Sequence, residues 1–208
     1  MYKEYITTCD PGKGGAYLRD IGGLNKKEMA TISDCYLCIE PEEGEIAISV
    51  CPINYTTIAV VATKKRTSKE EPRMHSVSYG ILIKSSSISL MLKKMEVTKF
   101  RRLHREFDEH DNLVKNEDEK LIENNRRWNS NYSGQEKVNM FFRVIQLIAK
   151  GEKILLQVDE TERINWLVTL YDFLLPEMAC KIFVSLGGEC PMNPPDILVK
   201  ENIEVQNN

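Results

Sequence analysis

The last third of the chain constrains the fold most, because strand and helix patterns alternate there with only short connections. Apolar residues recur at spacings of three and four over 138–148, which predicts an amphipathic helix that ends at Gly151. A buried-type strand follows at Lys153–Val158, then a second amphipathic helix at Glu160–Phe173 and another strand at Lys181–Leu186. A strand, a helix and a strand in this order predict a parallel βαβ unit with a right-handed crossover.

The first half of the chain has a different pattern, with short strands separated by turn-forming residues. Five runs rich in β-branched and aromatic residues predict strands: Tyr2–Thr8, Tyr36–Ile39, Glu45–Ile53, Thr57–Thr63 and Val77–Lys84. Asn25 is an N-cap candidate for one short helix, and Glu28 three residues later completes a capping-box pattern. The close spacing of the strands predicts a mainly antiparallel sheet.

The middle of the chain separates these two patterns. It is dense in charged residues and Asn and has few apolar anchors, so we interpret it as a charged, partly helical excursion. The sequence therefore predicts a mixed α/β protein in three parts. These are a mainly β half at 1–100, the charged excursion at 101–132, and an αβαβ half at 133–208 packed on the first.

Charge and apolar content narrow the range of functions. The 208 residues carry a net charge of −3, and each basic run is followed by an acidic one, so we expect no nucleic-acid binding. The chain shows no signal-peptide pattern and no apolar run of about 18 residues, so we expect a cytoplasmic protein without a membrane span. The six cysteines are then expected to be thiols.

Cys9 and His75 are the best candidates for catalytic chemistry. Cys9 lies at the end of a predicted strand beside a Gly-rich loop, where its thiol could act as a nucleophile with His75 as the base. The residues around Cys9 contain no local nucleophile signature, and a cysteine at such a position also packs as a small apolar residue. A cysteine-dependent hydrolase is therefore an alternative function.

Two further motifs match ligand sites only in part. The Gly-rich loop at 12–15 lacks the Gly-Lys-Ser/Thr order of a phosphate loop, so we interpret it as a turn. Cys35-x-x-Cys38 could belong to a zinc site with Cys9 or Cys51, but structural zinc needs a second pair of ligands, and no such pair is present in the sequence. We therefore expect buried structural cysteines and no cofactor.

Trp128 and Tyr132 stand in a polar stretch, with Arg127 beside Trp128. These three residue types are the ones enriched at binding hot spots, although a lone Trp also commonly packs into its own core. We take Arg127, Trp128 and Tyr132 as candidate protein-binding residues.

Three groups of short motifs carry a resemblance to a known family. They are Tyr5–Cys9 with Ile21–Leu24, Pro52–Tyr55 with Met74–Tyr79, and a run from Gly151 through Leu174-Leu175-Pro176 to Pro195–Val199. In them the chain resembles the amino-terminal domain of bacterial GTPase-associated proteins found in NTP-dependent conflict (defence) systems. The C-terminal run is also remotely similar to the longin and DENN modules of GTPase regulators. The chain departs from the family pattern at Lys64–Arg73, where an aromatic, Gly-rich loop is expected.

Both resemblances imply partnership with a GTPase or a related NTPase rather than an enzymatic activity. The expected function is therefore that of a non-catalytic interaction or adaptor subunit in a bacterial defence or signalling complex. The alternatives are the cysteine-dependent hydrolase built on Cys9 and His75 and a homo-oligomeric structural component. The sequence leaves the oligomeric state open.

Overall fold

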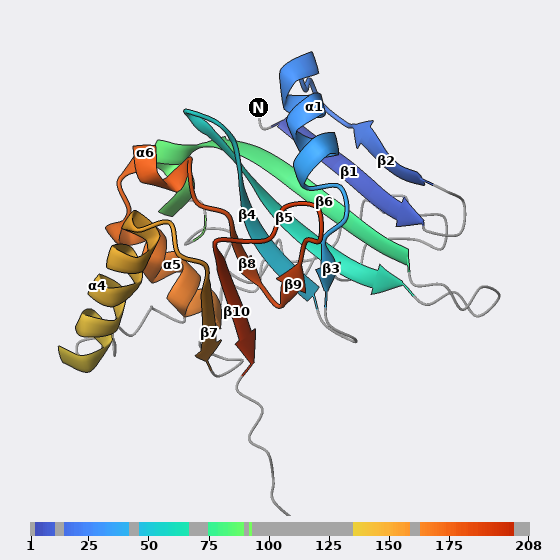
Figure 1. Ribbon diagram of the computed structural model, residues 1–208. Coiled ribbons are helices and arrows are strands. Elements are labelled where there is room, and N and C mark those ends of the chain that lie inside the picture. Colours follow the sequence, from blue (N-terminus) through green and yellow to red (C-terminus); the bar gives the residue numbers. More distant parts are fainter. Residues whose placement is uncertain are drawn as a thin grey trace, which may run out of the picture.

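A computed structural model describes residues 3–10, 15–41, 46–66, 75–89, 92, 135–158 and 163–201. Within these residues the main feature is an eight-stranded sheet with the strand order β2-β1-β6-β5-β4-β8-β10-β7 (Figure 1). The predicted mixed α/β class is confirmed. The predicted excursion at 101–132 lies outside the described residues.

The N-terminal part of the sheet is antiparallel throughout, as the sequence predicts. Its strands are β1 (Lys3–Asp10), β2 (Gly15–Asp20), β4 (Ile46–Asn54), β5 (Thr57–Arg66) and β6 (His75–Lys84). Each pairs with its neighbour in antiparallel register. The hairpin strand β2 was not predicted, because its short sequence contains only two apolar side chains besides Tyr17.

The C-terminal part adds three mutually parallel strands to the same sheet. These are β7 (Ile154–Val158), β8 (Val184–Leu186) and β10 (Ile197–Glu201), and β10 lies between the other two. The predicted parallel arrangement is therefore confirmed. β8 also pairs in antiparallel register with β4, so the two parts of the chain join edge to edge in one sheet.

The helix α1 (Lys26–Cys35) begins with the predicted capping box. The Asn25 side chain accepts from the Glu28 backbone N–H, and the Glu28 carboxylate accepts from the Asn25 backbone N–H, each at 2.9 Å. The same carboxylate accepts from Lys3 Nζ at 2.8 Å, so an ion pair ties the first turn of α1 to β1. The Glu28 side chain thus takes part in both the helix cap and the ion pair to β1.

The strand predicted at Tyr36–Ile39 is wrong. These residues form the irregular exit from α1 and lead to β3 (Glu40–Pro41), a short strand that pairs with β9 (Gly188–Glu189). Tyr36 packs its ring edge-on against Phe183, with ring centroids 5.2 Å apart. Burial beneath α1 therefore explains the apolar character that resembled a strand.

After β6 the chain forms the short 3-10 turn η1 (Ser85–Ser87), followed by the helical residues Ile88, Ser89 and Leu92, and the C-terminal part contains three more described helices. They are α4 (Gln135–Ala149), α5 (Arg163–Phe173) and α6 (Pro176–Ala179). Gly151 has φ +74°, the left-handed conformation expected of a glycine that stops a helix. No helix among the described residues has the length and apolar character needed to cross a membrane.

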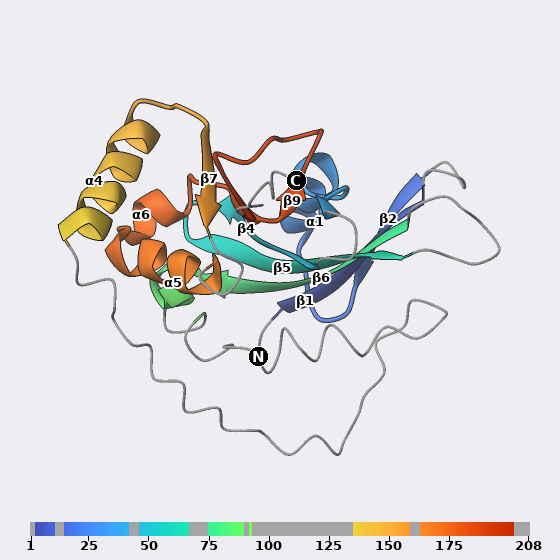
Figure 2. The same cartoon turned by 90° about the horizontal axis from the view of Figure 1, so that it is seen from below.

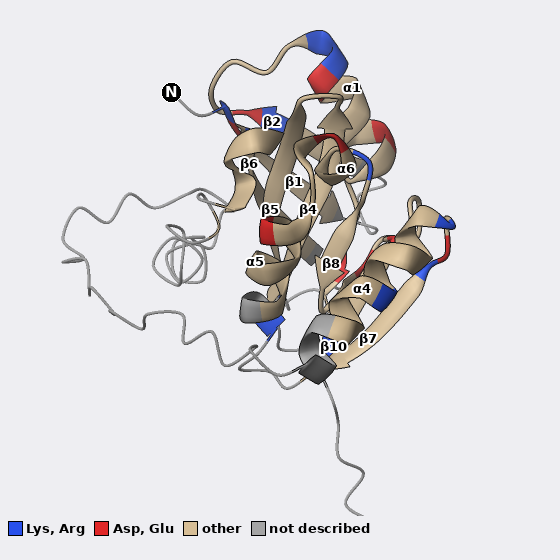
Figure 3. Ribbon diagram, turned by 90° about the vertical axis from the view of Figure 1, so that its left-hand side faces the viewer, with Lys and Arg blue, Asp and Glu red and all other residues tan. Residues whose placement is uncertain are grey.

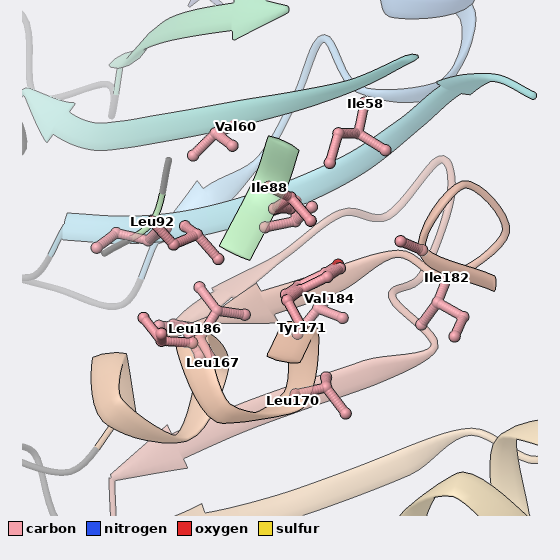
Figure 4. Close-up of a cluster of buried hydrophobic side chains, with 14 of the residues drawn as sticks. Ile58, Val60, Ile88, Leu92, Leu167, Leu170, Tyr171, Ile182, Val184 and Leu186 are labelled. Atoms are coloured by element: carbon pink, nitrogen blue, oxygen red, sulfur yellow. The ribbon is translucent and has the colours of Figure 1, made fainter. Parts of the chain in front are cut away.

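Two separate hydrophobic cores lie on opposite faces of the sheet. The larger core packs α5 and part of α4 on one face, with residues such as Val60, Leu170 and Val184 (Figure 4). The smaller core lies between α1 and the other face and includes Tyr5 and Ile32. In Figure 2 the sheet is seen nearly edge-on, with α1 above β5 and β6. We refer to these as the α5 face and the α1 face.

Candidate functional site

Buried hydroxyl groups cross the α1 face of the sheet. Thr63 on β5 and Ser78 on β6 hydrogen-bond through their side chains at 2.8 Å, and Ser49 on β4 does the same with Ser185 on β8 at 2.9 Å. Both are register pairs of adjacent antiparallel strands, whose opposed side chains share a face. Thr7 on β1 opposes Ser78, and its buried hydroxyl has no hydrogen-bond partner among the described residues.

Cys9 lies at the end of this hydroxyl-lined face. Its Sγ is 2.8 Å from Sγ of Cys38, which lies in the irregular segment after α1. In the register of β1 and β6 the residue opposite Cys9 is Ser76. Burial raises the pKa of the Cys9 thiol to about 12, with a further contribution from the hydrogen bond to Cys38 and a smaller opposing one from Ser76.

His75 begins β6 and pairs with Arg66 of β5, one position beyond the Cys9 partner Ser76. The His75 side chain lies outside the described part of the structure, so its pairing with Cys9 stays a prediction. The raised pKa of Cys9 works against a nucleophilic role, because the thiolate is the reactive form. A catalytic cysteine normally has a lowered pKa.

Three more cysteines surround α1 on the same face. Cys35 is the last residue of α1, and its backbone carbonyl accepts from Cys190 Sγ at 3.3 Å. Burial raises the pKa of both Cys51 and Cys190 above the usual thiol range. Among the described residues, no group of three or more His, Cys, Asp or Glu side chains has the arrangement of a metal site. The structure thus brings Cys38 next to Cys9 without assembling a zinc ligand set.

The α5 face has a different kind of candidate site at its margin. Phe142 on α4, Phe173 at the end of α5 and Leu175 just after it are 59 %, 57 % and 63 % exposed. We call these three residues the apolar margin. Phe173 stacks on Phe141, the residue before Phe142, with ring centroids 5.8 Å apart. The margin therefore spans the contact between α4 and α5.

The apolar margin is anchored by aromatic stacking and has charged neighbours. Phe141 also stacks on Trp166, which is fully buried, with centroids 5.5 Å apart. Arg143 follows Phe142 on α4 and Asp172 precedes Phe173 on α5, whereas β7 beside α4 carries no charge (Figure 3). Exposed apolar side chains rimmed by polar ones have the character of a protein-binding surface.

Only part of the apolar margin was predictable from the sequence. The spacing over 138–148 predicts that Phe142 shares the buried stripe of α4 with Phe141, but Phe142 is exposed, because the helix turns Phe141 and Val144 toward the core instead. The signal that could have identified Phe142 as an exposed residue was its position directly beside Phe141 in the buried stripe. The predicted binding residues Arg127, Trp128 and Tyr132 lie outside the described residues.

Comparisons of the chain with family models, curated proteins and solved structures found no match.

Proposed function

We propose that this protein is a non-catalytic protein-interaction subunit that binds its partner through the apolar margin of α4 and α5. The observation that carries the proposal is the exposure of three large apolar side chains, Phe142 on α4 and Phe173 and Leu175 at the end of α5. Exposed aromatic and aliphatic groups of this size lose contact with water on binding, and aromatic anchors dominate many interfaces. The partner proposed is a GTPase or related NTPase of a bacterial defence or signalling complex, which the family resemblance implies.

The packing beneath the margin supports this role. Phe173 stacks on Phe141, which in turn stacks on the buried Trp166, so the Phe173 ring is already held in place before binding. A pre-organised surface avoids the entropic cost of fixing side chains, which otherwise weakens association. The candidate residues Arg127 and Trp128 precede α4 in the chain, and the proposal includes them as further contacts.

The test is a titration of the purified protein with the NTPase encoded by a neighbouring gene, followed by calorimetry. Phe142→Asp should weaken binding at least about tenfold, because it places a charge where an apolar side chain is buried in the complex. Tyr17→Asp is the matched control, since Tyr17 is 61 % exposed on β2, the edge strand at the opposite end of the sheet from β7. The control should bind as the wild type does.

Three outcomes would contradict the proposal. One is the absence of binding to any neighbouring NTPase, and another is equal loss with Phe142→Asp and Tyr17→Asp. The third is self-association of the wild type, seen by light scattering and abolished by Phe142→Asp, which would assign the margin to a second copy of this chain. Trp128→Ala and Tyr132→Ala in the same titration test the residues predicted from the sequence.

A further inference from the structure

We infer that Cys9 and Cys38 form a redox-reversible modification site, at which a small disulfide such as oxidised glutathione converts the two thiols into an intrachain disulfide. Their sulfur atoms are 2.8 Å apart, and both residues are partly exposed. A disulfide bond is about 2.05 Å long, so closure requires a movement of less than about 1 Å. This inference is independent of the proposed binding function.

The fold holds the two thiols in place from different directions. Cys9 lies in the body of the sheet, where β1 pairs with β2 on one side and β6 on the other, opposite Ala16 and Ser76. Cys38 is flanked by the buried side chains Leu37 and Ile39. Because both positions are fixed by packing and strand pairing, the sulfur contact belongs to the folded chain and needs no rearrangement of an element.

Exposure separates this pair from the other cysteines. Cys51 and Cys190 are 0 % and 1 % exposed, and Cys180 is buried on the opposite face of the sheet. Cys35 is partly exposed, but the Cys190 thiol contacts its backbone carbonyl rather than its sulfur. Cys9 and Cys38 thus combine access to an oxidant with a neighbouring sulfur.

The reaction balances with one molecule of oxidised glutathione. One cysteine thiolate attacks a glutathione sulfur, so that a mixed disulfide forms and one glutathione thiolate leaves. The second cysteine loses its proton and attacks the mixed disulfide at the protein sulfur, releasing a second glutathione. The protein loses two electrons and two protons, and the oxidant gains both as two glutathione thiols.

The environment of Cys9 slows formation of the disulfide near neutral pH. Burial and the hydrogen bond to Cys38 raise the pKa of the Cys9 thiol, so little of it is present as the reactive thiolate. We therefore expect slow oxidation near neutral pH and faster oxidation at higher pH.

The experiment incubates the reduced wild-type protein with oxidised glutathione at pH 8 and measures intact mass and linked peptides. The expected mass loss is about 2 Da, with two of the six cysteines no longer alkylated and full reversal by dithiothreitol. Digestion with chymotrypsin cuts after Leu37, and Glu-C cuts after Glu42 or Glu43, because Pro41 blocks cleavage after Glu40; Cys38 is then on a peptide separate from Cys35 and Cys51. The linked peptides should contain Cys9 and Cys38.

Variants test the assignment of the pair. Cys38→Ser should abolish the mass loss, and Cys180→Ser, which removes a buried cysteine from the other face, should leave it unchanged. Wild-type peptide mapping needs no variant and decides the matter if Cys38→Ser fails to fold. Retention of six alkylated thiols, a stable glutathione adduct on Cys9 or Cys38, or a bond between other cysteines would overturn the inference.

Discussion

The two faces of the sheet carry different kinds of buried side chains. The α5 face is covered by branched aliphatic and aromatic side chains, including the fully buried Trp166. The α1 face carries the paired hydroxyls, such as Ser49 with Ser185, and five of the six cysteines. One face therefore depends on apolar area and close packing, and the other also depends on polar groups that must keep their partners and their protons.

The largest expected effect comes from raising the pH, which should weaken both faces. Tyr5 and Cys51 on the α1 face and Tyr171 on the α5 face are fully buried, and burial raises each pKa well above its usual value. Their stabilising contribution is complete below the unfolded pKa, about 9 for thiols and 10 for Tyr, and is lost as pH rises. Each group should lower the free energy of unfolding by about 1.4 kcal/mol per pH unit.

Urea unfolding from pH 8 to pH 11, with a phosphine reductant present, measures this loss. Tyr5→Phe and Tyr171→Phe should each make the decline with pH shallower, and neither removes a hydrogen bond to a described residue. If the two variants reduce the slope equally, both faces contribute to the loss of stability at high pH. A free energy of unfolding that stays constant up to pH 11 would contradict the prediction.

Truncation of Trp166 should be the largest single-site effect at neutral pH. Trp166→Ala leaves a cavity beneath Phe141 on the α5 face, and such changes cost about 3–5 kcal/mol. Chemical denaturation provides the measurement. Tyr55→Ala, an exposed aromatic truncation, should change stability by no more than about 0.5 kcal/mol. Comparable losses in the two variants would show that the α5 core is not the main source of stability.

Gly80→Ala should test how tightly the α1 face is packed. A Cβ at Gly80 would lie 2.1 Å from Cζ of Tyr5, whose ring crosses β6 at that point. Overpacking of this kind costs about 1–3 kcal/mol. The cost should disappear largely in the Tyr5→Ala background, because the colliding ring is then absent. Additive losses in a double-mutant cycle would argue against the contact.

The smallest effect on stability is expected where β4 of the antiparallel part pairs with β8 of the parallel part. Ser49→Ala removes the hydroxyl partner of Ser185 across β4 and β8 and should cost about 1 kcal/mol, because one buried hydroxyl is left unpaired. The double variant Ser49→Ala with Ser185→Ala should cost less than twice that. Ser86→Ala, at an exposed position, is the control. A single-variant loss equal to the control would show that the pair adds nothing.

The long central strands β1, β4, β5 and β6 were predictable from sequence, but their two faces were not. In β4 and β5 both faces are buried, so residues such as Val60 and Val61 give no alternation of polar and apolar types that would assign a side. The contact between Cys9 and Cys38 spans 29 residues and depends on α1 returning along the sheet. Local patterns fix the cap at Asn25, whereas such long-range contacts follow only from the assembled topology.

Because β10 lies between β7 and β8, the C-terminal part of the sheet cannot form during synthesis until β10 has been made. β7 hydrogen-bonds to β10 alone within the described sheet, so it has no strand partner until β10 has emerged from the ribosome. Val158 and Ile197 are 39 positions apart. At roughly 5–20 residues per second, the nascent chain therefore presents the apolar β7 to chaperones for several seconds before its partner arrives.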